Sequence, residues 1–111
     1  MTRYLISFDD GAMTFAEKDM PAVADAAHAV ARELKEAGAW IFGAGVTSKD
    51  EVSVVGTDGS VRNGAEDKAY VGGFSIVEVP SREEALEWAA KLAVACRCAQ
   101  EVRELYYDPE S

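Results

Sequence analysis

The sequence predicts a single α+β domain of the ferredoxin-like, split βαβ type, with an extra short hairpin. Segments of strand period and helix period follow one another in the order strand, helix, strand, hairpin, strand, helix, strand. The 111 residues suffice for one core, and no repeat, low-complexity tract or linker divides residues 1–111. An apolar fraction of 49% with 28% charged residues is typical of globular domains.

The first half of the chain predicts a strand, a helix and a second strand. Residues 4–8 alternate from side to side with the period of a strand. A helix can begin near Pro21 and end at Gly38, because proline suits the first turn and glycine suits the position after the last. The stripe that faces the core recurs at steps of four and three: Val23, Ala27, Val30, Leu34 and Ala37. The aromatic and small residues of 39–45 predict a strand covered on both faces.

The middle of the chain predicts a hairpin and a long strand. Residues 52–57 alternate and then meet Asp58-Gly59, a dipeptide typical of tight hairpin turns. Residues 70–79 return to strand character before Pro80. The fourth strand of the main sheet is expected at 102–107, with Pro109 ending the ordered chain.

The second helix is predicted to start at a capping box. Ser81 and Glu84 have the spacing at which each side chain reaches the backbone N–H of the other residue. The inward stripe of this helix is Ala85, Trp88, Ala89, Leu92, Ala93 and Cys96.

Apolar side chains occupy both sides of the expected strands. Tyr4, Ile6, Phe8, Trp40, Phe42, Phe74 and Ile76 alternate with Leu5, Ile41, Val77, Val79 and Leu105. Two helices cover only one face of a sheet. If the other face stays exposed to water, the domain loses several kcal/mol of stabilisation, at about 25 cal/mol per Å² of apolar surface. We therefore expect a homodimer that packs sheet on sheet, a dimeric α+β barrel with the helices outside. The alternative is that some of these residues are single exposed apolar side chains, which are common.

The charge balance restricts the partners. Eleven basic and 20 acidic residues give a net charge of −9, which repels phosphate backbones and anionic headgroups, so we expect neither nucleic acid nor membrane as a partner. The start of the chain has no apolar run of signal-peptide length, and we expect a cytoplasmic protein. Cys96 and Cys98 are one residue apart, an awkward spacing for a disulfide, and are read as reduced thiols.

No motif for a metal or a cofactor is present, and we expect neither. The chain has no phosphate-binding loop, no His-Glu-x-x-His and no Cys-x-x-Cys. Cys96 and Cys98 provide only half of a tetrahedral site, and the single histidine lies on the other helix.

His28 is the candidate catalytic residue, because histidine is the side chain that exchanges protons near neutral pH without help. Its helical position lies off the apolar stripe, on a flank beside Ala24 and Lys35. A functional role needs a nearby carboxylate, for which Asp9 and Asp10 at the end of the first strand are candidates, with Asp25 as a third. The alternative is a solvated surface histidine.

Four residues form the candidate ligand-binding set: Tyr4, Trp40, Lys68 and Arg103. Arg103 could hold a ligand carboxylate, although an arginine beside Glu101 and Glu104 more often pairs with its acidic neighbours. Trp40 could line an apolar cavity, although aromatic residues at such spacings are usually part of the core.

Residues from both halves resemble the YCII-related domain family, in its DGPF-type branch. The resemblance rests on the run from Val71 to Ala89 with Glu101-Val102-Arg103 after it, and on Tyr4 to Phe8, the helix with His28, and Gly43-Ala44-Gly45. It implies a dimeric α+β barrel of ferredoxin-like protomers.

Two departures from the family pattern stand out. The Asp-Gly-Pro-Phe region is replaced by Asn63-Gly64-Ala65-Glu66-Asp67-Lys68, which keeps the glycine and the lysine. Relatives outside the branch use a histidine and an aspartate at a cleft; His28 matches the histidine, but Trp40, Ile41 and Phe42 stand where the acid is expected.

The resemblance therefore implies a homodimer with a small-molecule cleft in which His28 acts as acid or base, with the carboxylate supplied from elsewhere. The alternative is a non-catalytic binding or regulatory accessory module, as in relatives that accompany extracytoplasmic-function sigma factors.

Overall fold

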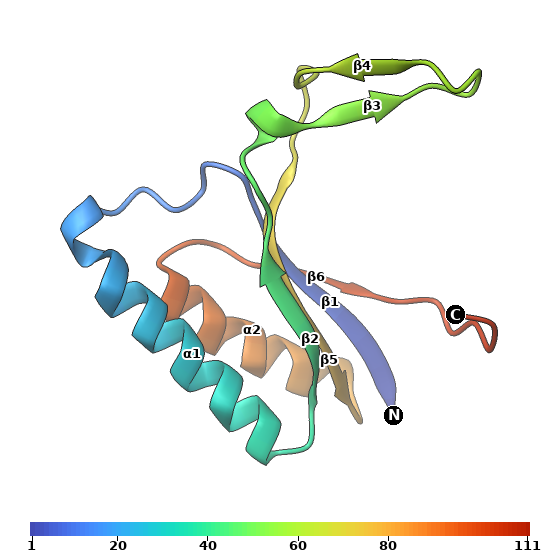
Figure 1. Cartoon of the computed structure of the whole chain (residues 1–111). Coiled ribbons are helices and arrows are strands. Elements are labelled where there is room, and N and C mark those ends of the chain that lie inside the picture. Colours follow the sequence, from blue (N-terminus) through green and yellow to red (C-terminus); the bar gives the residue numbers. More distant parts are fainter.

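The computed structural model describes residues 1–111 and contains six strands and two α-helices (Figure 1). In chain order these are β1 (Thr2–Asp9), α1 (Met20–Glu36), β2 (Trp40–Gly45), β3 (Ser53–Val55), β4 (Val61–Asn63), β5 (Val71–Val79), α2 (Arg82–Cys96) and β6 (Glu101–Glu104). Single 3-10 turns lie at Glu17–Asp19 and Lys49–Glu51. The main sheet has the antiparallel order β2-β5-β1-β6, and β3 pairs only with β4. This is the predicted α+β, ferredoxin-like arrangement with an extra hairpin.

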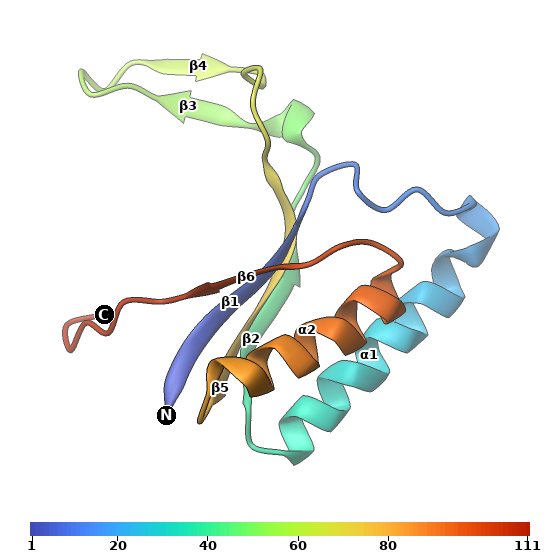
Figure 2. The ribbon, with the colours of Figure 1, turned by 180° about the vertical axis from the view of Figure 1, so that it is seen from behind.

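Both helices pack on the same face of the main sheet, and the core lies between these two layers (Figures 1 and 2). The largest fully buried side chains are Ile6, Leu34, Val77 and Val79. In the register of β1 with β5, Tyr4 lies opposite Val77, so the alternation of each strand brings the two apolar rows onto one face.

The helix ends follow the expected local chemistry, with one difference. Gly38, just beyond α1, has φ 71°, the left-handed conformation that glycine adopts at least cost. At the start of α2 the Ser81 hydroxyl accepts the N–H of Glu84 at 3.3 Å, which is one half of the predicted capping box. The reciprocal bond is not formed. Arg97 ends α2 with φ 58°, and its guanidinium pairs with Asp19 at 3.1 Å.

The hairpin β3–β4 stands away from the two-layered body (Figure 1). Its turn is closed by Asp58, whose carboxylate accepts the Ser60 hydroxyl at 2.7 Å and the Ser60 N–H at 2.9 Å. These bonds lower the pKa of the Asp58 carboxyl. Gly59 has φ 84°, as the Asp-Gly signal predicts.

The last strand is shorter than predicted. β6 ends at Glu104, which lies opposite Tyr4, and only the N–H of Leu105 continues the ladder, to the carbonyl of Arg3 at 2.9 Å. Because β1 itself begins at Thr2, the antiparallel register offers no backbone to pair beyond residue 106. Tyr106 and Tyr107 are exposed in a C-terminal segment that leaves the sheet.

The face of the sheet away from the helices has no cover within the chain. Leu5 lies opposite Ile76, and Ile76 lies opposite Phe42, so these side chains share the side that alternates with the core; Phe74 lies there too, 6.0 Å from Phe42 between ring centroids. We call Leu5, Phe42, Phe74 and Ile76 the open face. The radius of gyration is 15.6 Å, against about 13 Å for a compact chain of similar length. No helix is long and apolar enough to span a bilayer.

Candidate functional site

A cleft of about 350 Å³ lies between α1 and the part of the sheet where β2, β5 and β1 meet. Most of its lining is apolar. Its polar side chains are few: His28, Lys35, Ser75, Cys96 and Gln100. We call this space the His28 cleft. A concave, mostly apolar pocket with a few polar groups is the usual form of a small-molecule site.

Two aromatic rings lie close against glycine backbone beside the cleft. A Cβ added at Gly43 would lie 2.5 Å from a ring carbon of Trp40, and a Cβ at Gly73 would overlap the ring of Phe8. Phe8 and Gly73 are opposite one another in the β1–β5 register, and all four residues except Gly73 line the cleft. Because neither glycine has a side chain, both rings can pack directly against the backbone of the sheet. This leaves space for the cleft above the rings.

His28 is exposed and projects from α1 into the lining of the cleft. The buried residues of α1 are Val23, Val30 and Leu34, so His28 lies off the packed stripe, as its spacing predicts. None of the four ion pairs of the chain involves His28.

The aspartates considered as partners of His28 are placed elsewhere, and none of them lines the cleft. Asp10 lies at the base of the hairpin, where its carboxylate accepts the N–H of Lys49 at 2.7 Å and its own N–H donates to the carbonyl of Tyr70 at 2.8 Å. Asp9 is exposed at the end of β1, opposite Val71. Asp25 is exposed on α1.

The expected ligand-binding residues are distributed over four places. Trp40 lines the His28 cleft. Tyr4 is 4% exposed and belongs to the core. Lys68 lies in the loop before β5, with its ammonium 5.0 Å from the ring centroid of Tyr70. Arg103 is on β6 opposite Leu5, exposed and without an ion pair. Of the four, the structure brings only Trp40 to His28.

The sequence places Lys35 beside His28 but gives no sign that Met13 joins the lining. Lys35 follows His28 by seven residues, so the helical repeat already indicated that they share a side of α1. Its ammonium is 5.7 Å from the ring centroid of Trp40. Met13 comes from the irregular segment before α1, and no local pattern signals its place in the lining.

The two thiols are held in their neutral form. Burial raises the pKa of Cys96, which lines the cleft, and the nearby Cys98 adds to that rise. Burial also raises the pKa of Cys98, partly offset by the Gln100 amide, which donates to its sulfur at 3.6 Å. No group of three or more His, Cys, Asp or Glu side chains is placed to hold a metal ion.

We expect both thiols to resist alkylation near neutral pH, because the thiolate is the nucleophile. The rate with iodoacetamide, followed by mass spectrometry, should rise only at alkaline pH, and Cys96 should react more slowly than Cys98. As pH rises, the thiols of the unfolded chain lose their protons at a lower pH than those of the native chain, whose pKa values are raised. Stability should therefore fall as pH rises past the ordinary thiol pKa of about 8.5. Rapid labelling of Cys96 in neutral buffer would contradict this account.

Comparison with known proteins identifies the family. The model of the YCII-related domain matches residues 3–106. A solved structure, the 5-chloro-2-hydroxyhydroquinone dehydrochlorinase of Burkholderia phenoliruptrix AC1100 in complex with 2,5-dihydroxybenzoquinone, is similar with a TM-score of 0.55. The two chains are 19% identical, and the match covers 97% of each, which shows a common fold. No curated protein matches by sequence. The chain belongs to the YCII-related domain family.

Proposed function

We propose that this chain is a homodimeric YCII-type protein that binds a small planar ring compound in the His28 cleft and exchanges a proton with it through His28. The observation that carries the proposal is the position of the only histidine on an apolar cleft whose floor is aromatic. The proposal adds a binding site and a proton-transfer reaction to the family membership.

The shape and surface of the cleft support a planar ring as the ligand. The rings of Phe8 and Trp40 offer flat surfaces for stacking, and Met13 and Met20 offer adaptable thioethers beside them. The structurally similar dehydrochlorinase was solved with a bound benzoquinone. A hydroxylated ring of that kind fits the combination of apolar walls and few polar groups.

The charges of the cleft support proton transfer with an ionisable ring. The imidazole of His28 accepts a proton from an acidic ring hydroxyl, which leaves an imidazolium and a ring anion. The imidazolium exchanges its proton with solvent and delivers one to a carbon of the ring anion, and the imidazole then removes the original hydrogen of that carbon, which restores the ring anion and completes one exchange of the ring C–H. The ammonium of Lys35 stabilises the anion. No carboxylate of the lining competes with the ligand for the imidazole.

The homodimer is supported by the open face. Its four large apolar side chains lie on one side of the sheet, and nothing in the chain covers them. A second copy that presents the same face would remove both from water in one symmetric contact, at about 25 cal/mol per Å². The helices and the His28 cleft then remain on the outside.

Hydrogen exchange tests the proposal. The protein is mixed with 2,5-dihydroxybenzoquinone in D₂O, and loss of the ring-proton signal is followed by ¹H NMR, with affinity measured by calorimetry. The wild type should bind the ring and accelerate exchange, and His28→Asn should slow the exchange by about 100-fold. Asp25→Asn, a matched change on an exposed part of α1 outside the cleft, should exchange at the wild-type rate.

The outcomes separate the two candidate functions. Binding without acceleration by the wild type would contradict catalysis and favour a non-catalytic binding or regulatory module. Equal exchange with His28→Asn would remove His28 from the chemistry. If the wild type neither binds the ring nor accelerates exchange, the proposed ligand class is wrong.

A further inference from the structure

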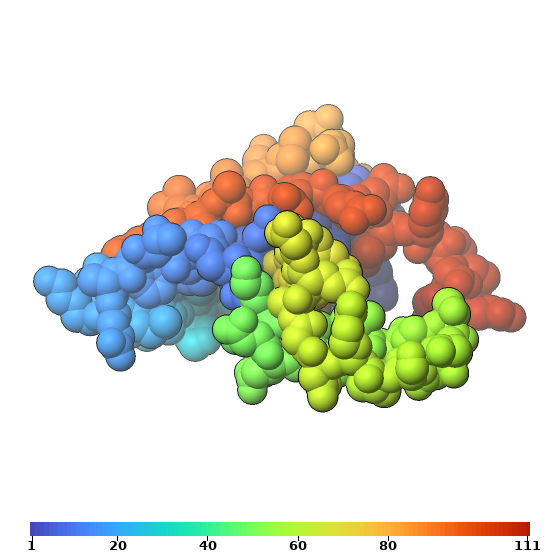
Figure 3. Space-filling model, turned by 90° about the horizontal axis from the view of Figure 1, so that it is seen from above, coloured from blue at the N-terminus to red at the C-terminus, as the bar shows by residue number.

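The β3–β4 hairpin extends on the side of the sheet away from the helices. In Figure 1 the helices lie to the left of the sheet and the hairpin reaches to the right, and Figure 2 shows the same relation from behind. Seen from above, in Figure 3, the hairpin again lies away from α1. The open face and the hairpin therefore border the same space, and the C-terminal segment projects to that side as well (Figures 1 and 2).

The base of the hairpin is held firmly to the body. The Asp10 carboxylate binds the backbone of Lys49, and the N–H of Val46 donates to the carbonyl of Gly72 at 2.9 Å. Gly72 lets β5 approach the backbone of Asp10 so closely that a Cβ there would lie 2.8 Å from its Cα. The hairpin thus leaves the sheet in a defined direction.

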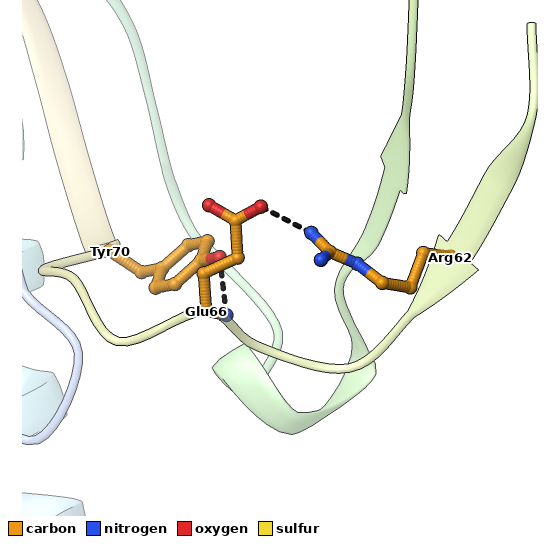
Figure 4. A network of polar contacts seen from close by, with 3 residues as sticks. All are labelled: Arg62, Glu66 and Tyr70. Atoms are coloured by element: carbon orange, nitrogen blue, oxygen red, sulfur yellow. Dashed lines mark hydrogen bonds and ion pairs between the residues drawn. The ribbon is translucent and has the colours of Figure 1, made fainter.

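A second set of contacts braces the strand that returns to the body. Arg62 on β4 pairs with the carboxylate of Glu66, and the N–H of Glu66 donates to the hydroxyl of Tyr70 at 3.0 Å (Figure 4). The N–H of Gly64 also bonds to the carbonyl of Val52 at 2.9 Å. A segment ordered before binding loses less entropy when it binds.

The hairpin nevertheless carries apolar surface that its own chain does not cover. Val55 and Val61 lie opposite one another across β3 and β4 and are 64% and 63% exposed. An isolated two-stranded hairpin is marginally stable in water, because it has nothing to pack its apolar pair against. A hairpin whose base is held rigidly and whose valine pair is uncovered is well suited to bind another protein surface.

We propose that the β3–β4 hairpin is an arm that binds a second copy of this chain, with Val55 and Val61 packed on the partner. The proposal rests on the homodimer of the proposed function and goes beyond it by assigning the hairpin a role. The occupant is a second copy because the arm borders the open face, so a protomer seated on that face comes within its reach. Two-fold symmetry then gives the dimer two equivalent arms.

Sedimentation equilibrium of the full chain tests the arm. The double variant Val55→Ser/Val61→Ser should raise the dimer dissociation constant by about tenfold or more, since two valines lose their apolar contact. A shortened hairpin, with residues 54–62 replaced by Asn-Gly, should weaken the dimer at least as much while Ser53 and Asn63 keep the base. The control is Val94→Ser on α2, which is 81% exposed in the helical layer and should leave the dissociation constant unchanged.

The results distinguish the arm from the dimer itself. A wild-type chain that stays monomeric at all concentrations would contradict the homodimer and the arm together. A dimer whose dissociation constant is the same in wild type, double variant and shortened hairpin would overturn the arm and leave the homodimer standing. Circular dichroism of each variant verifies that the main sheet and helices are retained.

Discussion

Ile76→Asp is expected to convert the proposed homodimer into a monomer. Ile76 lies on β5 at the centre of the open face, between Leu5 and Phe42 of the neighbouring strands. In the monomer a carboxylate there remains in water, so folding is preserved, but in a sheet-on-sheet dimer it is buried without a partner. That burial costs several kcal/mol, and each 1.4 kcal/mol is about a factor of ten in the dissociation constant.

Light scattering at micromolar concentration measures this effect. The matched control is Ala90→Asp, which adds the same charge at an exposed position of α2 and should leave the dimer intact. An Ile76→Asp protein that still dimerises as the wild type does would show that the open face is not the interface.

Gly43→Ala is expected to close the His28 cleft. The added Cβ would lie 2.5 Å from the Trp40 ring and 3.1 Å from the carbonyl of Phe74. Because the backbone carbonyl cannot yield, the indole must move, and the space beside it is the cleft. We expect affinity for the proposed ring ligand to fall by about tenfold or more, and overpacking to cost about 1–3 kcal/mol of stability.

The indole N–H signals in ¹H–¹⁵N NMR report the displacement, since the chain has only two tryptophans. In Gly43→Ala the Trp40 signal should shift while that of Trp88 stays. Gly45→Ala is the matched control on β2, because nothing lies within 4 Å of a Cβ there, and it should leave the Trp40 signal in place. An unmoved Trp40 signal in Gly43→Ala, with ligand affinity retained, would contradict the aromatic floor.

The elements of the fold could be predicted because their signals are local. The steps of four and three before Gly38, and the Asp58-Gly59 turn, are set by residues a few positions apart. The end of β6 could not be predicted in this way. It depends on how the last residues pair with β1, about a hundred residues earlier, and therefore on the register between distant strands.

The site was only partly predictable for the same reason. Helical spacing correctly placed His28 off the packed stripe of α1. The register shift between Phe8 and Asp9 decides which way the end of β1 faces, and it directs Asp10 to the base of the hairpin rather than into the cleft. The contact of Phe8 with Gly73 likewise arises only from cross-strand pairing.

The most direct measurement of the central claim, that the His28 cleft is the ligand site, is NMR of the single histidine. Protein labelled at its histidine and tryptophans is titrated with 2,5-dihydroxybenzoquinone, so that every imidazole signal belongs to His28. The account predicts saturable shifts of the His28 ring and the Trp40 indole, with Trp88, which does not line the cleft, unmoved. The claim would be contradicted if the Trp88 signal shifted saturably while the His28 and Trp40 signals did not, or if no signal shifted at all.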